Sequence, residues 1–260
     1  MYSAYTLSSL SFNENPDEYY RAGLAQKSGK AAALQRELKK YICEDGSLSA
    51  TRIQAEWFPS LQADVFLSHS HRDEKMAITL SGYFKKIFGL TTFIDSCVWG
   101  YAPDLLEAID SQYCRNKGES TYNYQKRNLS TGHVHMMLAN ALTRMIDKTE
   151  CLIFYATPRS IDVHKSIQMN RTFSPWIFHE IETARTIRQH KERKPQIKEN
   201  VLHADSSERL SISYDLDFSD FIGLDADDIN EWRQLIEKQG GIHALDLLYK
   251  KFGLSGRHPK

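Results

Sequence analysis

The sequence predicts an α/β fold built on a doubly wound parallel sheet, and three observations carry this prediction. A short apolar run, Val65–Leu67, ends abruptly at the polar residues Ser68–His71, a pattern typical of a buried parallel strand. Two further strand-like runs, Thr91–Ile94 and Cys151–Tyr155, also end in polar residues, and helix-like segments separate the three. Strands that alternate with helices indicate right-handed crossovers and therefore a parallel sheet.

The first 60 residues are expected to form an N-terminal extension that is only partly helical. Residues 1 to about 27 show no clear periodicity and are expected to be an irregular arm. Lys30–Ile42 has apolar residues at helical spacing and predicts a helix. Trp57 and Phe58 precede the first strand, and we expect them to pack against the domain because large apolar side chains are costly to expose.

Residues 61–260 are expected to form the main domain. Helical periodicity predicts six helices, at Asp73–Phe88, Pro103–Tyr113, His133–Ile146, Ser174–Ile187, Ala226–Lys238 and Ile242–Phe252. Leu210–Tyr214 alternates in polarity and predicts a fourth strand. Two stretches, about 111–132 and 161–173, are expected to be inserted loops, of which 115–132 is polar and rich in Asn, Lys and Tyr.

Composition argues against several classes of function. The 33 basic and 33 acidic residues cancel, so no global positive field would gather nucleic acid or an anionic membrane. No apolar run approaches the roughly 20 residues of a membrane span, and the first residues do not resemble a secretory signal. The four cysteines are scattered without C-x-x-C spacing, which argues against a zinc module or a disulfide framework. We expect a cytoplasmic protein that binds neither nucleic acid nor membrane.

Several common catalytic and binding motifs are absent from the sequence. There is no G-x-G-x-x-G, no P-loop and no G-x-S-x-G, which disfavours a Rossmann-type dinucleotide site, a nucleotide triphosphatase and an α/β-hydrolase. His133 and His135 lack carboxylates at ligand spacing, so no metal site is expected there. His69 and His71, at the end of the first strand, suit hydrogen bonding or stacking.

Trp176 and Glu180 are four residues apart in a predicted helix and therefore share one of its faces. A glutamate beside an indole would be partly desolvated and fixed in place. Spacing alone favours the plainer arrangement, a solvent-facing glutamate over a core tryptophan.

The strand Thr91–Ile94 ends at Asp95, and Trp99, Gly100 and Tyr101 follow in the next loop. These aromatic residues suit an exposed binding or assembly surface. They suit equally a loop that folds back over the edge of the sheet, and their spacing leaves both alternatives open.

Read together and in order, these segments resemble the Toll/interleukin-1 receptor (TIR) domain family. D-V-F-L-S-H-S-H-R-D-E resembles its first box, F-I-D-S-C-V-W-G its second, and C-L-I-F-Y-A-T-P followed by S-P-W-I-F-H-E-I its third strand and glutamate-bearing helix. The resemblance covers about residues 63–223 and is closest to stand-alone bacterial TIR proteins, including those of anti-phage systems such as Thoeris. It implies a flavodoxin-like sheet. The two insertions depart from the family pattern, as does Trp99-Gly100, where an acidic residue commonly precedes the glycine.

The resemblance implies an enzyme that cleaves the nicotinamide–ribose bond of NAD⁺ to give ADP-ribose or a cyclic isomer, in anti-phage defence signalling. NAD⁺ is then the substrate, and neither a cofactor nor a metal is implied. Glu180 matches the family's catalytic residue. The expected substrate-binding residues line the same cleft: Ser68, His69, Ser70, Asp95, Trp99, Gly100 and Trp176.

The resemblance also implies partners. Many TIR enzymes complete their site by self-association, for which Trp99–Tyr101 is the candidate loop, and an effector that binds the nucleotide product is a further expected partner. Two alternatives stay open. One is a TIR adaptor without catalysis, against which Glu180 argues. The other is a response-regulator-like or nucleotide-binding domain without catalysis, in which an acidic cluster at the strand ends would bind magnesium. Asp73 and Asp95 are available for such a cluster, but no companion acid beside the first strand completes it.

Overall fold

The computed structural model of the chain has a central five-stranded sheet, and every pairing within it is parallel. The strand order is β3 (Thr92–Phe93), β2 (Val65–Ser68), β4 (Cys151–Tyr155), β1 (Ser3–Leu7) and β8 (Ile222–Leu224). The structure describes residues 1–8, 10, 15–27, 38–95, 102–164, 169–188, 213–238 and 243–254. The predicted α/β class with a parallel sheet is confirmed.

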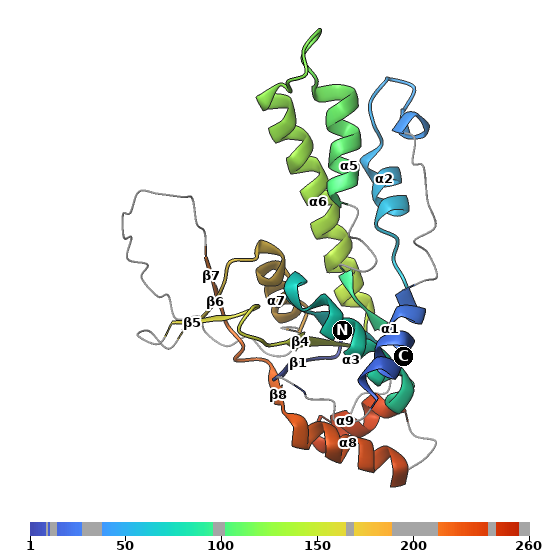
Figure 1. Ribbon diagram of the computed structural model, residues 1–260, viewed down its shortest axis with the longest axis vertical. Helices are drawn as coiled ribbons and strands as arrows, with labels where there is room; N and C mark the ends of the chain where they lie inside the picture. The colour runs from blue at the N-terminus through green and yellow to red at the C-terminus, as the bar shows by residue number, and fades with distance from the viewer. Residues whose placement is uncertain are drawn as a thin grey trace.

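Helices cover both faces of this sheet, so the predicted double winding is also confirmed (Figure 1). Val65 and Leu67 face one core, whereas Phe66 between them faces the other, as strand alternation requires. The first core is closed by α1 (Pro16–Lys27), α3 (Glu74–Phe88), α8 (Ala226–Lys238) and α9 (Ala244–Lys251). The second is closed by α2 (Ala50–Trp57), α5 (Ala102–Ile109), α6 (Tyr124–Lys148) and α7 (Pro175–Arg188).

The N-terminal segment differs most from the prediction. The expected irregular arm over residues 1–27 is wrong, because Ser3–Leu7 forms β1 between β4 and β8. Ala4, Tyr5 and Leu7 are fully buried, since the strand has neighbours on both sides and helices on both faces. The N-terminal strand therefore fills the fourth position of the sheet.

Helix α1 packs on α3 at very short range, which glycine alone permits. A Cβ atom added to Gly23 would lie 1.9 Å from the carbonyl oxygen of Ile78, and one added to Gly82 would lie 1.8 Å from that of Tyr19. The two backbones therefore touch at these positions, and the N-terminal segment is part of the packed domain.

The other predicted N-terminal features are partly confirmed. Trp57 and Phe58 are buried in the second core, as expected. Of the helix predicted over Lys30–Ile42, the described part is a short 3₁₀ turn, η1 (Leu38–Tyr41); residues 30–37 lie outside the described residues.

Helices α5, α6 and α2 extend together away from the sheet (Figure 1). The predicted loop over 115–132 is wrong in its second half, because α6 begins at Tyr124. Asn123 caps it, its side-chain oxygen accepting a hydrogen bond from the Lys126 N–H. The first turns of α6 were missed because they are mostly solvent-exposed and carry few apolar residues that mark a buried helix face.

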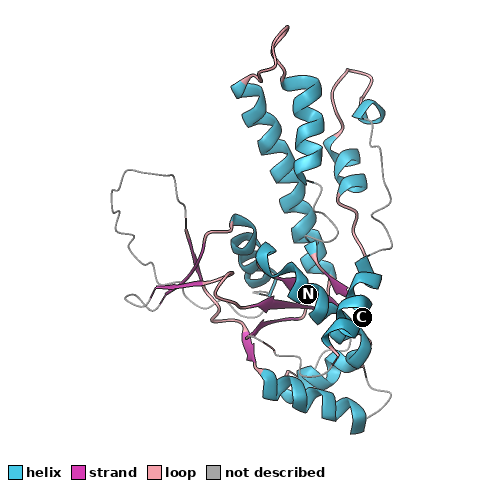
Figure 2. Ribbon diagram, viewed as in Figure 1, coloured by secondary structure: helices cyan, strands magenta, loops and turns pink. Residues whose placement is uncertain are grey.

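A second, smaller sheet lies beside the first (Figure 2). It is antiparallel and contains β5 (Asp162–His164), β6 (Met169–Thr172) and β7 (Tyr214–Leu216). The expected loop at 161–173 is therefore a hairpin. The fourth strand expected at 210–214 is wrong as a member of the main sheet, because Tyr214 belongs to β7 and residues 210–212 lie outside the described residues. The strand β8 that completes the main sheet has only three residues and was missed.

The strand order reverses direction at β2. The connection from β2 to β3 runs one way along the sheet, through α3 on the first face. The connection from β3 to β4 runs back the other way, through α5 and α6 on the second face, and places β4 on the opposite side of β2 from β3. In open α/β sheets the crevice at such a switch point is where ligands bind. The carboxyl ends of β2 and β4 therefore mark the place to look for a site. Among the described residues, no helix has the length and apolar character needed to cross a membrane.

Candidate functional site

Glu180 lies buried beside the carboxyl end of β2. Ser174 caps α7, accepting a hydrogen bond from the Ile177 N–H at 3.3 Å. Ile177, Ile181 and Ala184 are buried in the second core, and Glu180 falls on the same helical stripe. The helix therefore carries this carboxyl group inward, and only 2% of Glu180 is exposed. The solvent-facing glutamate that spacing alone favours is wrong.

Ser68, the last residue of β2, holds this carboxyl group. Its Oγ donates a hydrogen bond of 2.5 Å to Glu180 Oε2, and both side chains are buried. Within the described part of the chain, no lysine, arginine or histidine forms an ion pair with Glu180. Ser68 and Glu180 are thus brought together from positions far apart in the sequence.

Burial raises the pKa of Glu180 well above the ordinary carboxyl value, and the nearby charge of Asp95 raises it further. The hydrogen bond from Ser68 opposes this shift, because it stabilises the ionised form. Glu180 is therefore a buried carboxyl group, and among the described residues no cationic side chain balances the charge of its ionised form.

Asp95 and His69 border the same place. His69 is buried, with its Nδ1 3.8 Å from Asp95 Oδ1 and 3.4 Å from the carbonyl oxygen of Leu67. Asp95 follows β3 and keeps 29% of its side chain exposed. Adjacent strands thus bring together Ser68, His69 and Asp95 at the edge where Glu180 lies.

The other predicted site residues are placed differently. Trp176 is partly buried and packs against the second core, and its ring lies edge-on to that of His135 of α6, with centroids 5.4 Å apart. Ser70 caps the turn that begins α3, accepting a hydrogen bond from the Arg72 N–H at 3.4 Å. Trp99 and Gly100 lie outside the described residues.

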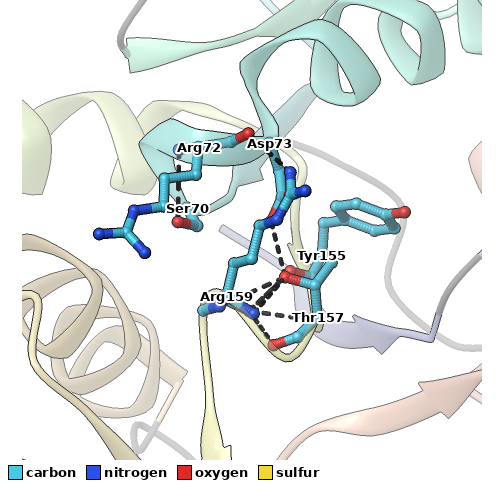
Figure 3. Close-up of polar contacts among 7 residues, drawn as sticks. Ser70, Arg72, Asp73, Tyr155, Thr157 and Arg159 are labelled. Carbon is cyan, nitrogen blue, oxygen red and sulfur yellow. Dashed lines mark hydrogen bonds and ion pairs between the residues drawn. The ribbon is translucent and has the colours of Figure 1, made fainter.

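A second polar cluster, which sequence reasoning missed as a unit, lies where β2 and β4 end (Figure 3). Asp73 is only 8% exposed. Its Oδ2 accepts a hydrogen bond of 2.6 Å from Thr157 Oγ1, and its Oδ1 forms an ion pair with Arg159 Nη1 at 3.1 Å. Arg159 Nη1 also donates to the carbonyl oxygen of Arg72 at 3.1 Å. The signal was available, because Thr157 and Arg159 follow one strand end and Asp73 follows the neighbouring one.

No group of three or more His, Cys, Asp or Glu side chains suited to a metal ion occurs among the described residues. Comparison with protein-family models, with curated proteins and with solved structures finds no match to this chain.

Proposed function

We propose that this protein is an NAD⁺ nucleosidase of the TIR type, with Glu180 as its catalytic residue. The observation that carries the proposal is a buried carboxyl group, beside the switch point of the sheet, that has a hydroxyl donor but no cationic partner among the described residues. A substrate that brings its own positive charge complements such a group. The nicotinamide ring of NAD⁺ carries that charge.

The chemistry needs little beyond this carboxylate. The bond between ribose C1′ and the pyridinium nitrogen breaks, its electron pair goes to that nitrogen, and nicotinamide leaves as a neutral molecule. The positive charge passes to the ribose, as in other oxocarbenium-like transition states. A cationic substrate beside Glu180 favours its ionised form, and the carboxylate then stabilises the charge that develops on the sugar.

The neighbouring residues have distinct roles in this proposal. Ser68 fixes Oε2 of Glu180, so that Oε1 is directed to a ribose hydroxyl. His69 and Asp95 border the substrate on the β3 side, and Trp176 lines the α6 side. Ser70 shapes the turn above β2.

Attack on the oxocarbenium-like carbon decides the product. Water gives ADP-ribose with release of one proton, whereas a nitrogen of the substrate's own adenine gives a cyclic isomer. Exclusion of water favours the second product. A role in anti-phage signalling in the cytoplasm, with an effector that binds this product, belongs to the same proposal.

Self-association is also part of the proposal, with Trp99–Tyr101 as the segment that covers the site of a neighbouring copy. Trp99→Ala is expected to lower both turnover and oligomer size in size-exclusion chromatography. Full turnover with unchanged oligomer size in this variant would remove the assembly proposal.

Nicotinamide release from NAD⁺ by the purified full-length protein tests the proposed function. We expect release by the wild type, and at least a hundredfold slower release by Glu180→Gln, because a neutral amide cannot stabilise the developing charge. Mass analysis then distinguishes ADP-ribose from a cyclic isomer. No release by the wild type, as dilute monomer or under crowding, would indicate the adaptor instead, and equal release by Glu180→Gln would remove the catalytic assignment.

A further inference from the structure

We propose that Arg159 and Arg72 form the subsite for the pyrophosphate of the dinucleotide substrate, and that Asp73 is the positioning residue that orients Arg159. This inference rests on the proposed function, because it assigns the anionic part of the same substrate. The polar cluster between the ends of β2 and β4 carries it (Figure 3).

The polar cluster lies across the switch point of the sheet. Ser68 pairs in register with Phe154, so the segments that follow β2 and β4 leave the sheet side by side. The hydrogen bond from Thr157 to Asp73 joins them directly across the switch point. Asp73 follows Ser68 by five residues, so their backbones lie within about 18 Å of each other. One extended dinucleotide bound along this edge can reach both clusters.

Most N–H donors of the two guanidinium groups have no partner among the described residues. Arg159 uses only Nη1, for Asp73 and for the carbonyl of Arg72, and its side chain remains 60% exposed. Within the described residues, its Nε and Nη2 and the whole guanidinium of exposed Arg72 have no hydrogen-bond or ion-pair partner. Figure 3 shows Arg159 extending toward Asp73 and Arg72 extending past Ser70 in another direction.

The two arginines would contribute differently to pyrophosphate binding, Arg159 through oriented hydrogen-bond donors and Arg72 through its charge. Arg159 is fixed in place at both ends: its guanidinium group pairs with Asp73, and its backbone N–H donates a hydrogen bond of 3.1 Å to Thr157 Oγ1. It therefore offers oriented donors of the kind that recognise phosphate oxygens. Arg72 supplies positive charge that no described carboxylate balances, which attracts an anion.

The arrangement also fits the requirements of the Glu180 site. A carboxylate that must meet a cationic ring should not also face the substrate's phosphates, because like charges repel. The basic pair lies in the loops after β2 and β4, whereas Glu180 lies on the inward face of α7, so the two ends of the substrate are separated by charge.

Equilibrium binding of ADP-ribose to the full-length protein, measured by calorimetry, tests the subsite without any turnover. We expect Arg159→Ala and Arg72→Ala each to weaken binding by about ten- to a hundredfold, as for a lost charge-assisted hydrogen bond. Arg233→Ala, which removes an exposed arginine paired only with Glu237 on α8 among its described ion-pair partners, is the matched control and should bind as the wild type does. Wild-type affinity in Arg159→Ala overturns the inference.

Asp73→Asn separates positioning from simple attraction. The substitution makes the cluster one unit more positive, so attraction alone would tighten ADP-ribose binding. We expect the opposite, several-fold weaker binding, because Arg159 loses the partner that orients it. Tighter binding, or unchanged binding in a variant with an intact thermal unfolding transition, overturns the positioning role.

Kinetics with a truncated substrate completes the test. Nicotinamide riboside has the cleaved bond but no phosphate, so Arg159→Ala should raise the KM for NAD⁺ and leave kcat/KM for nicotinamide riboside unchanged. Equal losses for both substrates overturn the subsite. Glu180→Gln should lose far more nicotinamide release than ADP-ribose affinity, because its carboxylate acts mainly on the charge that develops during cleavage. Failure of the catalytic proposal therefore appears in the turnover of Glu180→Gln, and failure of the subsite appears in the binding by Arg159→Ala.

Discussion

Two buried carboxyl groups lie at the same edge of the sheet, and they differ in what balances their charge. Asp73 meets an arginine and a threonine hydroxyl, whereas Glu180 meets a serine hydroxyl and the repulsion of Asp95. A carboxylate that is already paired stabilises the fold or orients its partner. A buried carboxyl group whose ionised form is left short of positive charge costs stability, and such groups cluster at functional sites.

Amide substitutions of these two carboxyl groups should therefore change the free energy of unfolding in opposite directions, and we expect no larger effect on stability from the other substitutions below. Asp73→Asn should lower the free energy of unfolding by about 1–3 kcal/mol, because it breaks a buried hydrogen-bonded network. Glu180→Gln should raise it, because the buried group no longer has to ionise. About 1 kcal/mol shifts the Tm of a chain of this size by about 2–4 °C, which thermal unfolding detects.

The effect of Glu180→Gln should also depend on pH. The pKa of Glu180 is raised in the folded state, so the folded protein holds this proton more tightly than the unfolded chain. Wild-type stability therefore falls as pH rises from the ordinary carboxyl range through the raised pKa, whereas glutamine does not titrate. The stability difference should grow with pH and vanish in acid; a difference that is constant from pH 4 to 8 would contradict the burial of an ionisable group.

Loss of the Ser68 hydroxyl should have a smaller, roughly tenfold effect on nicotinamide release. Ser68→Ala removes the donor that favours the ionised form, so the pKa of Glu180 should rise further and the acid limb of the pH profile should move to higher pH. The measurement is the pH dependence of kcat/KM.

Ser130→Ala is the matched control for this substitution. Ser130 donates an equally short hydrogen bond of 2.5 Å to the buried carboxylate of Asp110, at the junction of α5 and α6 away from the sheet edge. It should lower stability and leave nicotinamide release unchanged. A similar loss of release in both variants would show that Ser68 acts only through stability.

Removal of the like charge should have the smallest effect. Asp95→Asn should lower the pKa of Glu180 toward its usual range and move the acid limb of the profile to lower pH, with less than about a fivefold change in rate at neutral pH. Asp215→Asn, which removes an exposed carboxylate paired with Arg171, should leave the profile in place. A profile that Asp95→Asn does not move would indicate that the two carboxyl groups are independent.

The sequence predicts the elements whose pattern is local. Cys151–Tyr155 is a continuous apolar run and Ala226–Lys238 is an amphipathic helix, and both were predicted with the bounds that the structure has. Strand β1 was missed because Ser3–Leu7 mixes small, polar and aromatic residues, and its partner Cys151–Tyr155 is distant in the chain. Only tertiary pairing makes this segment a strand.

The candidate site could be predicted only in part for the same reason. The sequence places Ser68, Asp95 and Glu180 near strand ends or on the helix that follows, yet it does not show that Ser68 and Glu180 touch. Ile177 and Ile181, which flank Glu180 on the core stripe of α7, were a stronger signal of its burial than its spacing from Trp176.

The pH dependence of nicotinamide release by the wild type and by Glu180→Gln tests the central claim most directly. The wild-type kcat/KM should rise with pH through one ionisation that lies above the ordinary range of a glutamate and then level off, because the buried carboxyl group must ionise to act. Glu180→Gln should show no such step and at least a hundredfold lower activity. A step of the same size and position in Glu180→Gln would contradict the account.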